Sequence, residues 1–239
     1  MLSNSLSPLS ALRTELLKKG RPERSEATQK FFKDSILSHG VVAADVNEMA
    51  RRYFAACKGM EKEQVFALCE SLWQSGYQEE ALVACAWSYR VRKKFAPEDF
   101  KIFEGWIESY VTNWATCDTF CNHTVGALLE RYPEFLTELD KWAASENKWM
   151  RRAAAVSLIV PARKGIFFKE IIHIADLLLT DKDDMVQKGY GWMLKVASVT
   201  YPEAIFNYVM KHKQLMPRTA LRYAIEKLEA AYKQQAMKK

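Results

Sequence analysis

The sequence contains few of the residues that interrupt helices, with nine glycines and seven prolines among 239 residues. A β-sandwich or β-barrel needs many tight turns, and tight turns depend on these two residues. No stretch alternates apolar and polar side chains at the two-residue period of a half-buried strand. Alanine, leucine, lysine and glutamate, which favour helices, are abundant instead. The composition therefore predicts an all-α protein.

Long apolar segments are also missing. No run approaches the roughly 18 consecutive apolar residues of a membrane span, and the N-terminal "MLSNSLSPLSALRTELLKKG" has no apolar core of a signal peptide. We therefore expect a cytoplasmic protein with no membrane partner. The five cysteines include no CxxC pair, so we expect reduced thiols and not a disulfide framework.

Motifs for metal, cofactor or nucleophilic chemistry are absent as well. The closest group of metal-ligand types is Cys117, Cys121 and His123, and no fourth ligand stands nearby to complete a site. We expect these to be packed side chains and predict no metal. The sequence has no GxSxG element and no glycine-rich phosphate loop, so it predicts neither a serine hydrolase nor a nucleotide cofactor.

The chain reads as a series of helices with short breaks. The first is expected over 5–19, with leucines on one side, and the second over 26–40, ending near Gly40. No linker is long enough to separate two domains. We therefore expect one domain over 1–239. It would comprise an N-terminal helix and linker (1–24), helical repeats (25–233) and a polar tail (234–239).

Three segments in the second half align with one another. They are "NKWMRRAAAVSLI" (147–159), "DDMVQKGYGWMLK" (183–195) and "QLMPRTALRYAIE" (214–226). Each follows an apolar helix and a break, as expected for repeated helical hairpins. A single hairpin cannot bury its apolar face, so neighbouring hairpins must stack. The pattern predicts a right-handed curved solenoid of HEAT-like antiparallel helical hairpins.

The alignment places one basic residue at the same early position of three second helices, namely Arg152, Lys188 and Arg218. Equivalent positions of stacked repeats form a row, and a row of cations beside helix N-termini suits a phosphate backbone. Nearby cations that could extend the row are Arg151, Arg163 and Lys164. The alternative is an ordinary solvated face. The net charge of +6 is compatible with both interpretations.

The same alignment, moved back by one repeat, puts Asp118 in the column of cations. Nearby cations would keep its carboxylate ionised. Trp114 precedes Asp118 by one helical turn, and Trp192 follows Lys188 by one helical turn, so both indoles could face the same groove. The alternative is that these tryptophans are core residues.

At these residues the sequence resembles the AlkD-like DNA alkylation repair glycosylases, which are built from HEAT-like repeats. The matching pieces are "NWATCD" (113–118), "ENKWMRRAA" (146–154) and "QKGYGWMLKVASVTYP" (187–202). The resemblance runs from about residue 25 to 230. It implies a monomeric enzyme, nucleoid-associated in a bacterium or archaeon, that excises N3- and N7-alkylated purines from double-stranded DNA without a cofactor.

The resemblance also implies roles for single residues. Asp118 would stand near the anomeric carbon, Trp114 and Trp192 would hold the deoxyribose, and Arg152 would contact the backbone. The chain departs from the family at Ala115, where a second acid often stands, and at Phe31 or Phe32, where a tyrosine is expected. These departures leave open a non-catalytic DNA-binding member of the family. A protein-binding scaffold is a second alternative.

Overall fold

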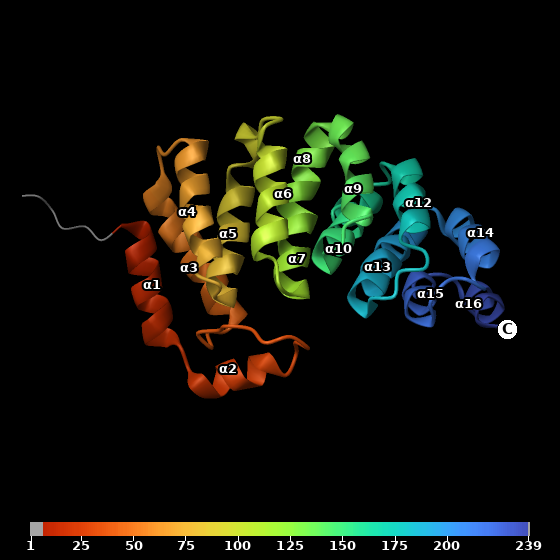
Figure 1. Ribbon diagram of the computed structural model, residues 1–239, viewed down its shortest axis with the longest axis horizontal. Coiled ribbons are helices and arrows are strands. Elements are labelled where there is room, and N and C mark those ends of the chain that lie inside the picture. The colour runs from red at the N-terminus through yellow and green to blue at the C-terminus, as the bar shows by residue number, and fades with distance from the viewer. Residues whose placement is uncertain (1–6, 239) are drawn as a thin grey trace, which may run out of the picture. The chain divides into compact units, whose positions relative to one another are not determined.

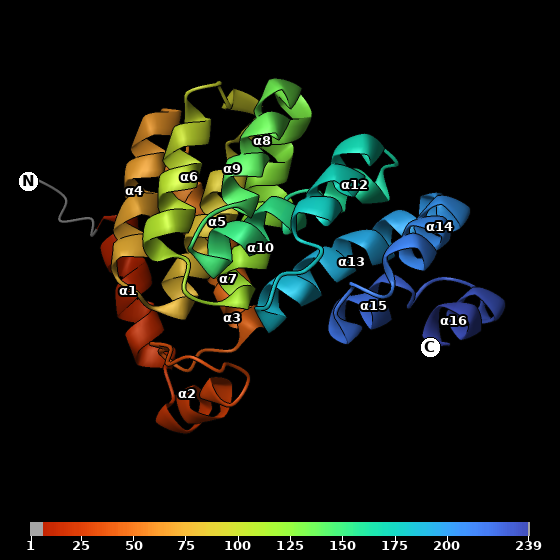
Figure 2. The same cartoon turned by 45° about the vertical axis from the view of Figure 1, so that its right-hand side comes forward.

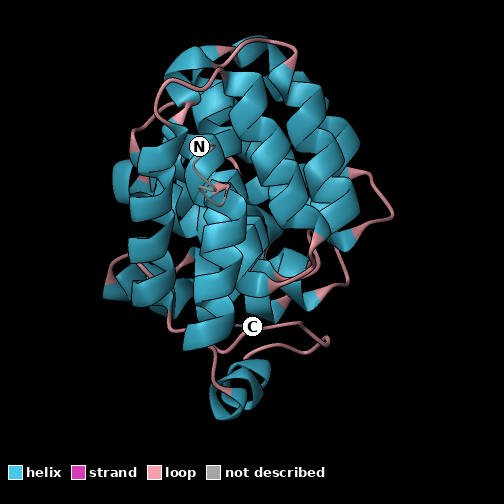
Figure 3. Cartoon of the chain, turned by 90° about the vertical axis from the view of Figure 1, so that its left-hand side faces the viewer, coloured by secondary structure: helices cyan, strands magenta, loops and turns pink. Residues whose placement is uncertain are grey.

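The computed structural model describes residues 7–238, and within them the regular structure is helical (Figure 3). The one β-type pairing in that range is an isolated parallel bridge between Leu37 and Tyr77. The all-α class expected from the scarcity of glycine and proline is confirmed. The handedness and curvature of a solenoid stay predictions.

The chain divides into two compact units. The first contains the residues up to 99 together with 109–120, and the second contains 100–108 together with 121–239. The division passes through helix α6 (Asp99–Tyr110) and again directly after helix α7 (Trp114–Phe120). No long linker marks the division, and the expectation of one domain over 1–239 stays a prediction.

The first unit is a set of helices that pack one after another. α1 contacts α3, α3 contacts α5, and α5 contacts both α4 and α7. Figures 1 and 2 show α2 lying across the end of this set. The bounds are α1 (Pro8–Lys19), α2 (Pro22–Gln29), α3 (Ala43–Phe54), α4 (Lys62–Gln74) and α5 (Gln78–Arg90), with short 3₁₀ turns at Ala55–Cys57 and Arg92–Lys94.

The N-terminal helix begins later than expected. α1 starts at Pro8, with the Ser7 hydroxyl accepting the Ser10 amide at its N-terminus, while residues 5 and 6 of the expected helix lie outside the described range. Leu12 and Leu16 are fully buried, so the predicted leucine face is the packed face. α2 begins at Pro22, inside the segment that was expected to be a linker.

The prediction of a helix over 26–40 was wrong in its second half. α2 ends at Gln29, and residues 30–42 form a loop that runs back to α5. The buried Glu79 carboxylate accepts hydrogen bonds from the amides of His39 (3.0 Å), Gly40 (2.9 Å) and Val41 (3.1 Å). These tertiary hydrogen bonds replace the helical ones, since a buried amide must find some acceptor.

Gly40 is required in this loop. Its φ of +76° lies in the left-handed region, and a Cβ atom there would come within 2.1 Å of the Arg21 carbonyl oxygen. Only glycine combines that backbone angle with so close an approach. The glycine that seemed to end a helix therefore fixes a contact between the loop and the start of α2.

The second unit contains two rows of helices. α10 packs against α13 and α13 against α15, while α9, α12 and α14 pack against the same helices as partners in hairpins. The bounds are α8 (Gly126–Arg131), α9 (Leu139–Ala143), α10 (Lys148–Val156), α11 (Ile159–Arg163), α12 (Phe168–Leu177), α13 (Asp184–Thr200), α14 (Pro202–His212), α15 (Arg218–Ala224) and α16 (Ala230–Met237). A π-turn at Cys121–Val125 precedes α8, and a 3₁₀ segment at Pro133–Glu138 precedes α9.

The three aligned segments of the sequence form α10, α13 and α15, and these helices lie side by side (Figures 1 and 2). Gly191 explains the close packing of α13 on α15. A Cβ atom at this position would lie 2.7 Å from the Tyr223 Cβ and 2.9 Å from the Ala220 carbonyl oxygen. The three aligned segments are therefore neighbours in the fold, while their equivalence as HEAT-like repeats stays a prediction. At the other end of this unit α16 continues to Met237, so most of the expected polar tail is helical.

Candidate functional site

The seven tryptophans separate into two groups by burial. Five are buried: Trp73, Trp87, Trp106, Trp142 and Trp149. Trp114 is 37% exposed and Trp192 is half-buried. Because an indole usually contributes most when it is packed, the two that remain accessible are the ones available to a ligand. They are the two that the sequence singled out.

Trp114 is the first residue of α7, and Asn113 caps that helix. The buried Asn113 side chain accepts the amides of Ala115 (3.0 Å) and Thr116 (3.1 Å) and donates to the Gln78 side chain (2.9 Å). A cap of this kind satisfies the free amides at a helix start. It also ties the start of α7 to α5, which fixes the position of the indole.

The Trp114 indole is held by the loop that follows α2. Its ring stacks on Phe32, with 5.5 Å between the ring centroids and 22° between the planes. Its N–H donates to the Phe31 carbonyl oxygen at 3.4 Å. Phe31 itself is 75% exposed. The sequence analysis named Phe31 and Phe32 only as departures from the family and did not predict this contact.

Asp118 lies one turn after Trp114 on the same side of α7. Cys117 and Phe120 point into the core and are fully buried, whereas Asp118 is half-buried. Residues four apart on a helix are neighbours on its surface. The first unit therefore presents a carboxylate and an indole together, at a helix that is firmly attached on its other side.

The aligned cations belong to the second unit, and the structure gives them different surroundings. Arg152 on α10 is 5% exposed, and its guanidinium donates to the backbone carbonyl of Met185 at the start of α13. Its side chain also lies against α13, because a Cβ atom at Gly189 would come within 3.1 Å of the Arg152 Cγ. Arg152 thus joins α10 to α13, a role that the sequence did not reveal.

Lys188 and Arg218 are more accessible than Arg152. Lys188 is half-buried and pairs with Asp184 one turn earlier on α13 (2.8 Å). Arg218 is exposed at the first position of α15 and makes no hydrogen bond or ion pair with any residue in 7–238. Trp192, on the α13 turn after Lys188, likewise has no hydrogen-bond partner in that range. Of the three aligned cations, Arg218 is therefore the most accessible one, and its charge is not balanced by a described side chain.

The three other cations of the predicted row, Arg151, Arg163 and Lys164, differ in whether they already have partners within the protein. Arg151 pairs with Asp181 at 2.6 Å and donates to the carbonyls of Ser145 and Glu146. Arg163 and Lys164 are exposed at the end of α11, and Lys164 pairs with Glu130 at 2.6 Å. Internal partners thus already hold Arg151 and Lys164. A phosphate role for the whole set, and a common site of Asp118 with Trp192 and Arg152, stay predictions.

The cysteines do not offer a nucleophile. All five are buried, and burial raises the pKa of the Cys57, Cys69 and Cys85 thiols. A buried, protonated thiol is a poor nucleophile and metal ligand. Among the described residues, no group of three or more His, Cys, Asp or Glu side chains is arranged to hold a metal ion. No helix in that part of the chain combines the length and the apolarity of a membrane span.

The fold and these residues define a class of protein, an all-helical protein with a half-buried carboxylate and two partly exposed indoles. Comparison with known families gives that class its name. Residues 12–228 match the family described as DNA alkylation repair enzyme. The chain therefore belongs to the DNA alkylation repair enzyme family, and the resemblance found from three short pieces is confirmed.

Two solved structures have a similar fold. A predicted DNA alkylation repair enzyme from Enterococcus faecalis is 17% identical, with a TM-score of 0.79 over 89% of this chain and 98% of that one. The protein smu.31 from Streptococcus mutans UA159 is 19% identical, with a TM-score of 0.60 over 78% and 94% of the two chains. No curated protein matches significantly. At these identities the two structures establish the fold, while the family match assigns the chain to DNA repair.

Proposed function

We propose that this protein is a DNA glycosylase that excises N3- and N7-alkylated purines from double-stranded DNA, acting as a monomer without a cofactor. The observation that carries the proposal is the placement of Asp118 beside Trp114. Both are accessible on one side of a capped helix whose other side is buried. Membership of the DNA alkylation repair family supports the choice of substrate.

The chemistry of the substrate explains why so few groups are needed. A purine alkylated at N3 or N7 already carries a positive charge, so the base leaves without being protonated by an acid. As the glycosidic bond breaks, its electron pair goes to the base and positive charge develops on the sugar. A fixed carboxylate stabilises such an oxocarbenium-like state. In our proposal the Asp118 carboxylate fills this role and orients the water that adds to the anomeric carbon, and the proton that this water loses passes to solvent.

The indoles of Trp114 and Trp192 would support the same state. The face of an indole attracts positive charge, with a typical contribution of about 0.5–2 kcal/mol. Trp114 is suited to this because its N–H is directed to the Phe31 carbonyl and its ring rests on Phe32, which leaves the rest of the ring accessible. The exposed Arg218 and the half-buried Lys188 are the members of the basic row best placed to meet phosphates.

Substitution of Asp118 tests the proposal. We expect Asp118→Asn to fold and to bind duplex DNA, but to release N7-methylguanine about a hundredfold more slowly, because losing one well-placed electrostatic group typically costs about 3 kcal/mol. The measurement is single-turnover release of methylated bases, separated by chromatography. Asp140→Asn is the matched control, since Asp140 is half-buried like Asp118 and pairs with His173. Unchanged release by Asp118→Asn would refute the role of this carboxylate.

A second candidate function is DNA binding without excision. Two observations favour it: Ala115 occupies the position of a second acid, and the Arg152 guanidinium is committed to the Met185 carbonyl. A non-catalytic member would bind alkylated duplex and release no base, so the wild-type protein in the same assay separates the two functions.

A further inference from the structure

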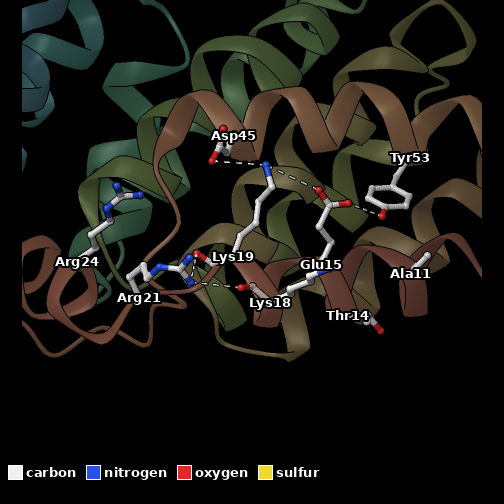
Figure 4. A pocket seen from close by; sticks show the side chains of 9 residues that line it. All are labelled: Ala11, Thr14, Glu15, Lys18, Lys19, Arg21, Arg24, Asp45 and Tyr53. Atoms are coloured by element: carbon white, nitrogen blue, oxygen red, sulfur yellow. Dashed lines mark hydrogen bonds and ion pairs between the residues drawn. The ribbon is translucent and has the colours of Figure 1, made fainter.

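The first unit contains a cavity of about 650 Å³ between α1, the start of α2 and α3. Figure 4 shows the side chains that line it. Four of them are basic (Lys18, Lys19, Arg21 and Arg24) and two are acidic (Glu15 and Asp45), with Ala11, Thr14 and Tyr53 completing the wall. None of these residues belongs to the site described above, so the cavity needs a separate explanation.

The two carboxylates in the cavity are already neutralised. Glu15 accepts hydrogen bonds from the Arg52 guanidinium at 2.7 and 2.8 Å and from the Tyr53 hydroxyl at 2.6 Å. These bonds lower the pKa of Glu15, so the carboxylate stays ionised and paired with Arg52. The ammonium group of Lys19 lies 3.6 Å from Asp45 and 3.9 Å from Glu15. The negative charges of Glu15 and Asp45 are therefore balanced by Arg52 and Lys19. The remaining basic side chains of the cavity have no carboxylate partner among the described residues.

Three cations remain around the opening. Arg21 donates to the carbonyl oxygens of Lys18, Lys19 and Gly20 at the end of α1, which orients its guanidinium without neutralising it. Lys18 and Arg24 are exposed, and the side chain of neither forms a hydrogen bond or ion pair with the residues of 7–238. Three like charges without carboxylate partners are unfavourable for the folded state. An anion bound among them would remove that repulsion.

The excess of positive charge extends along α2 towards the proposed site. Residues 18–33 contain six basic and two acidic residues, although the whole chain carries only +6. α2 has eight residues and is therefore about 12 Å long, which corresponds to about three to four base pairs of duplex. It ends just before Phe32, on which Trp114 stacks. A strand that follows these cations would reach the Trp114 indole.

We propose that the cavity lined by Lys18, Arg21 and Arg24 binds a phosphate of the DNA backbone, a few nucleotides from the position where the damaged nucleotide meets Trp114. The choice of DNA as the source of the phosphate rests on the proposed function. The site contributes affinity and register but no catalysis, because phosphate contacts position a duplex without reading its sequence.

The test is the salt dependence of binding to an undamaged duplex, measured by fluorescence anisotropy. The double variant Lys18→Gln with Arg24→Gln should reduce the slope of log K against log salt by about 1, since one lost phosphate contact lowers the slope by about 0.9. The matched control is Arg51→Gln with Lys58→Gln, which removes the same two charge types from exposed positions outside the cavity. Its slope should remain close to that of the wild-type protein.

The proposed phosphate site would be overturned if the double variant and the control had the same slope of log K against log salt. It would also be overturned if the wild-type protein did not bind the duplex. Binding of an acidic peptide that the double variant abolishes, with duplex binding unchanged, would assign the cavity to a protein partner and overturn it as well. Release of N7-methylguanine is followed in parallel. If the wild-type protein releases the base but the double variant and the control have equal salt slopes, only the phosphate site is refuted. If the double variant has a reduced slope but the wild-type protein releases no base, only the glycosylase activity is refuted.

Discussion

The indole ring of Trp114 stacks on the ring of Phe32, with 5.5 Å between their centroids. The contact joins the start of α7 to the loop after α2. That loop is in turn attached to α5, where the buried carboxylate of Glu79 accepts three consecutive backbone amides. The accessible indole next to Asp118 is therefore positioned by residues far from it in the sequence. Phe32 is a positioning residue in the proposed reaction.

Replacing Phe32 should slow base release without removing it. Phe32→Ala takes away a stacking contact of the kind that contributes about 0.5–1.5 kcal/mol, so we expect the single-turnover rate to fall roughly two- to tenfold. Phe32→Tyr keeps the ring and should restore the rate. The comparison of the two variants distinguishes positioning from general damage. A rate for Phe32→Ala equal to wild type would show that Trp114 is held adequately without the stack.

Arg152 and Arg218 occupy equivalent positions in the repeat but should respond differently to substitution. Arg152→Ala removes the guanidinium that donates to the Met185 carbonyl, and losing a hydrogen bond from a charged group costs about 1.5–3 kcal/mol. Arg218→Gln should change stability by less than about 0.5 kcal/mol, but it should lower the salt slope of duplex binding by about 1. Urea unfolding and a salt titration of both variants check this. An Arg152→Ala protein as stable as the wild type would contradict the bridging role.

Two glycines in helices should give opposite results when replaced by alanine. At Gly191 the added methyl group would lie 2.7 Å from the Tyr223 Cβ, so α13 and α15 would have to separate. Overpacking of this kind costs about 1–3 kcal/mol. At Gly105 on α6 no heavy atom lies within 4 Å of the new methyl group. Gly105→Ala should therefore stabilise the protein by about 0.5–1 kcal/mol, and thermal unfolding of the two variants compares them directly.

Glu80 should make stability depend on pH in the acid range. Burial opposes its ionisation, but the neighbouring His39 and Arg13 side chains outweigh burial and lower the pKa of Glu80 below its usual value of 4.5. The ionised form binds Arg13 at 2.8 Å. A lowered pKa means that this contribution is complete above about pH 4.5 and is lost as the pH falls towards the lowered value.

The variant Glu80→Gln tests the dependence. Its free energy of unfolding should be below that of the wild type at neutral pH, and the difference should shrink as the pH falls below about 4.5. Urea unfolding at a series of pH values gives both curves. A difference that stays constant from neutral to acid pH would show that the charge of Glu80 does not contribute.

Much of the fold could be predicted because it depends on local patterns. Scarce glycine and proline excluded sheet architectures, and the alignment of three segments selected α10, α13 and α15, of which α13 packs against both of the others. The pattern failed for residues 30–42. There the amides bind Glu79 and the Gln29 side chain accepts the Ile36 amide, so acceptors brought by other segments decided the conformation.

For the candidate site, the sequence by itself determined which residue types are available: an aspartate one turn after a tryptophan, and cations at equivalent positions of repeats. It could do so because helical periodicity converts spacing into a shared face. Only the tertiary structure decided their surroundings. It buried Arg152 against α13, left Arg218 exposed, placed Trp114 on Phe32 and gathered Lys18, Arg21 and Arg24 around one cavity. Burial and partner choice depend on contacts between distant segments, and no local pattern encodes those contacts.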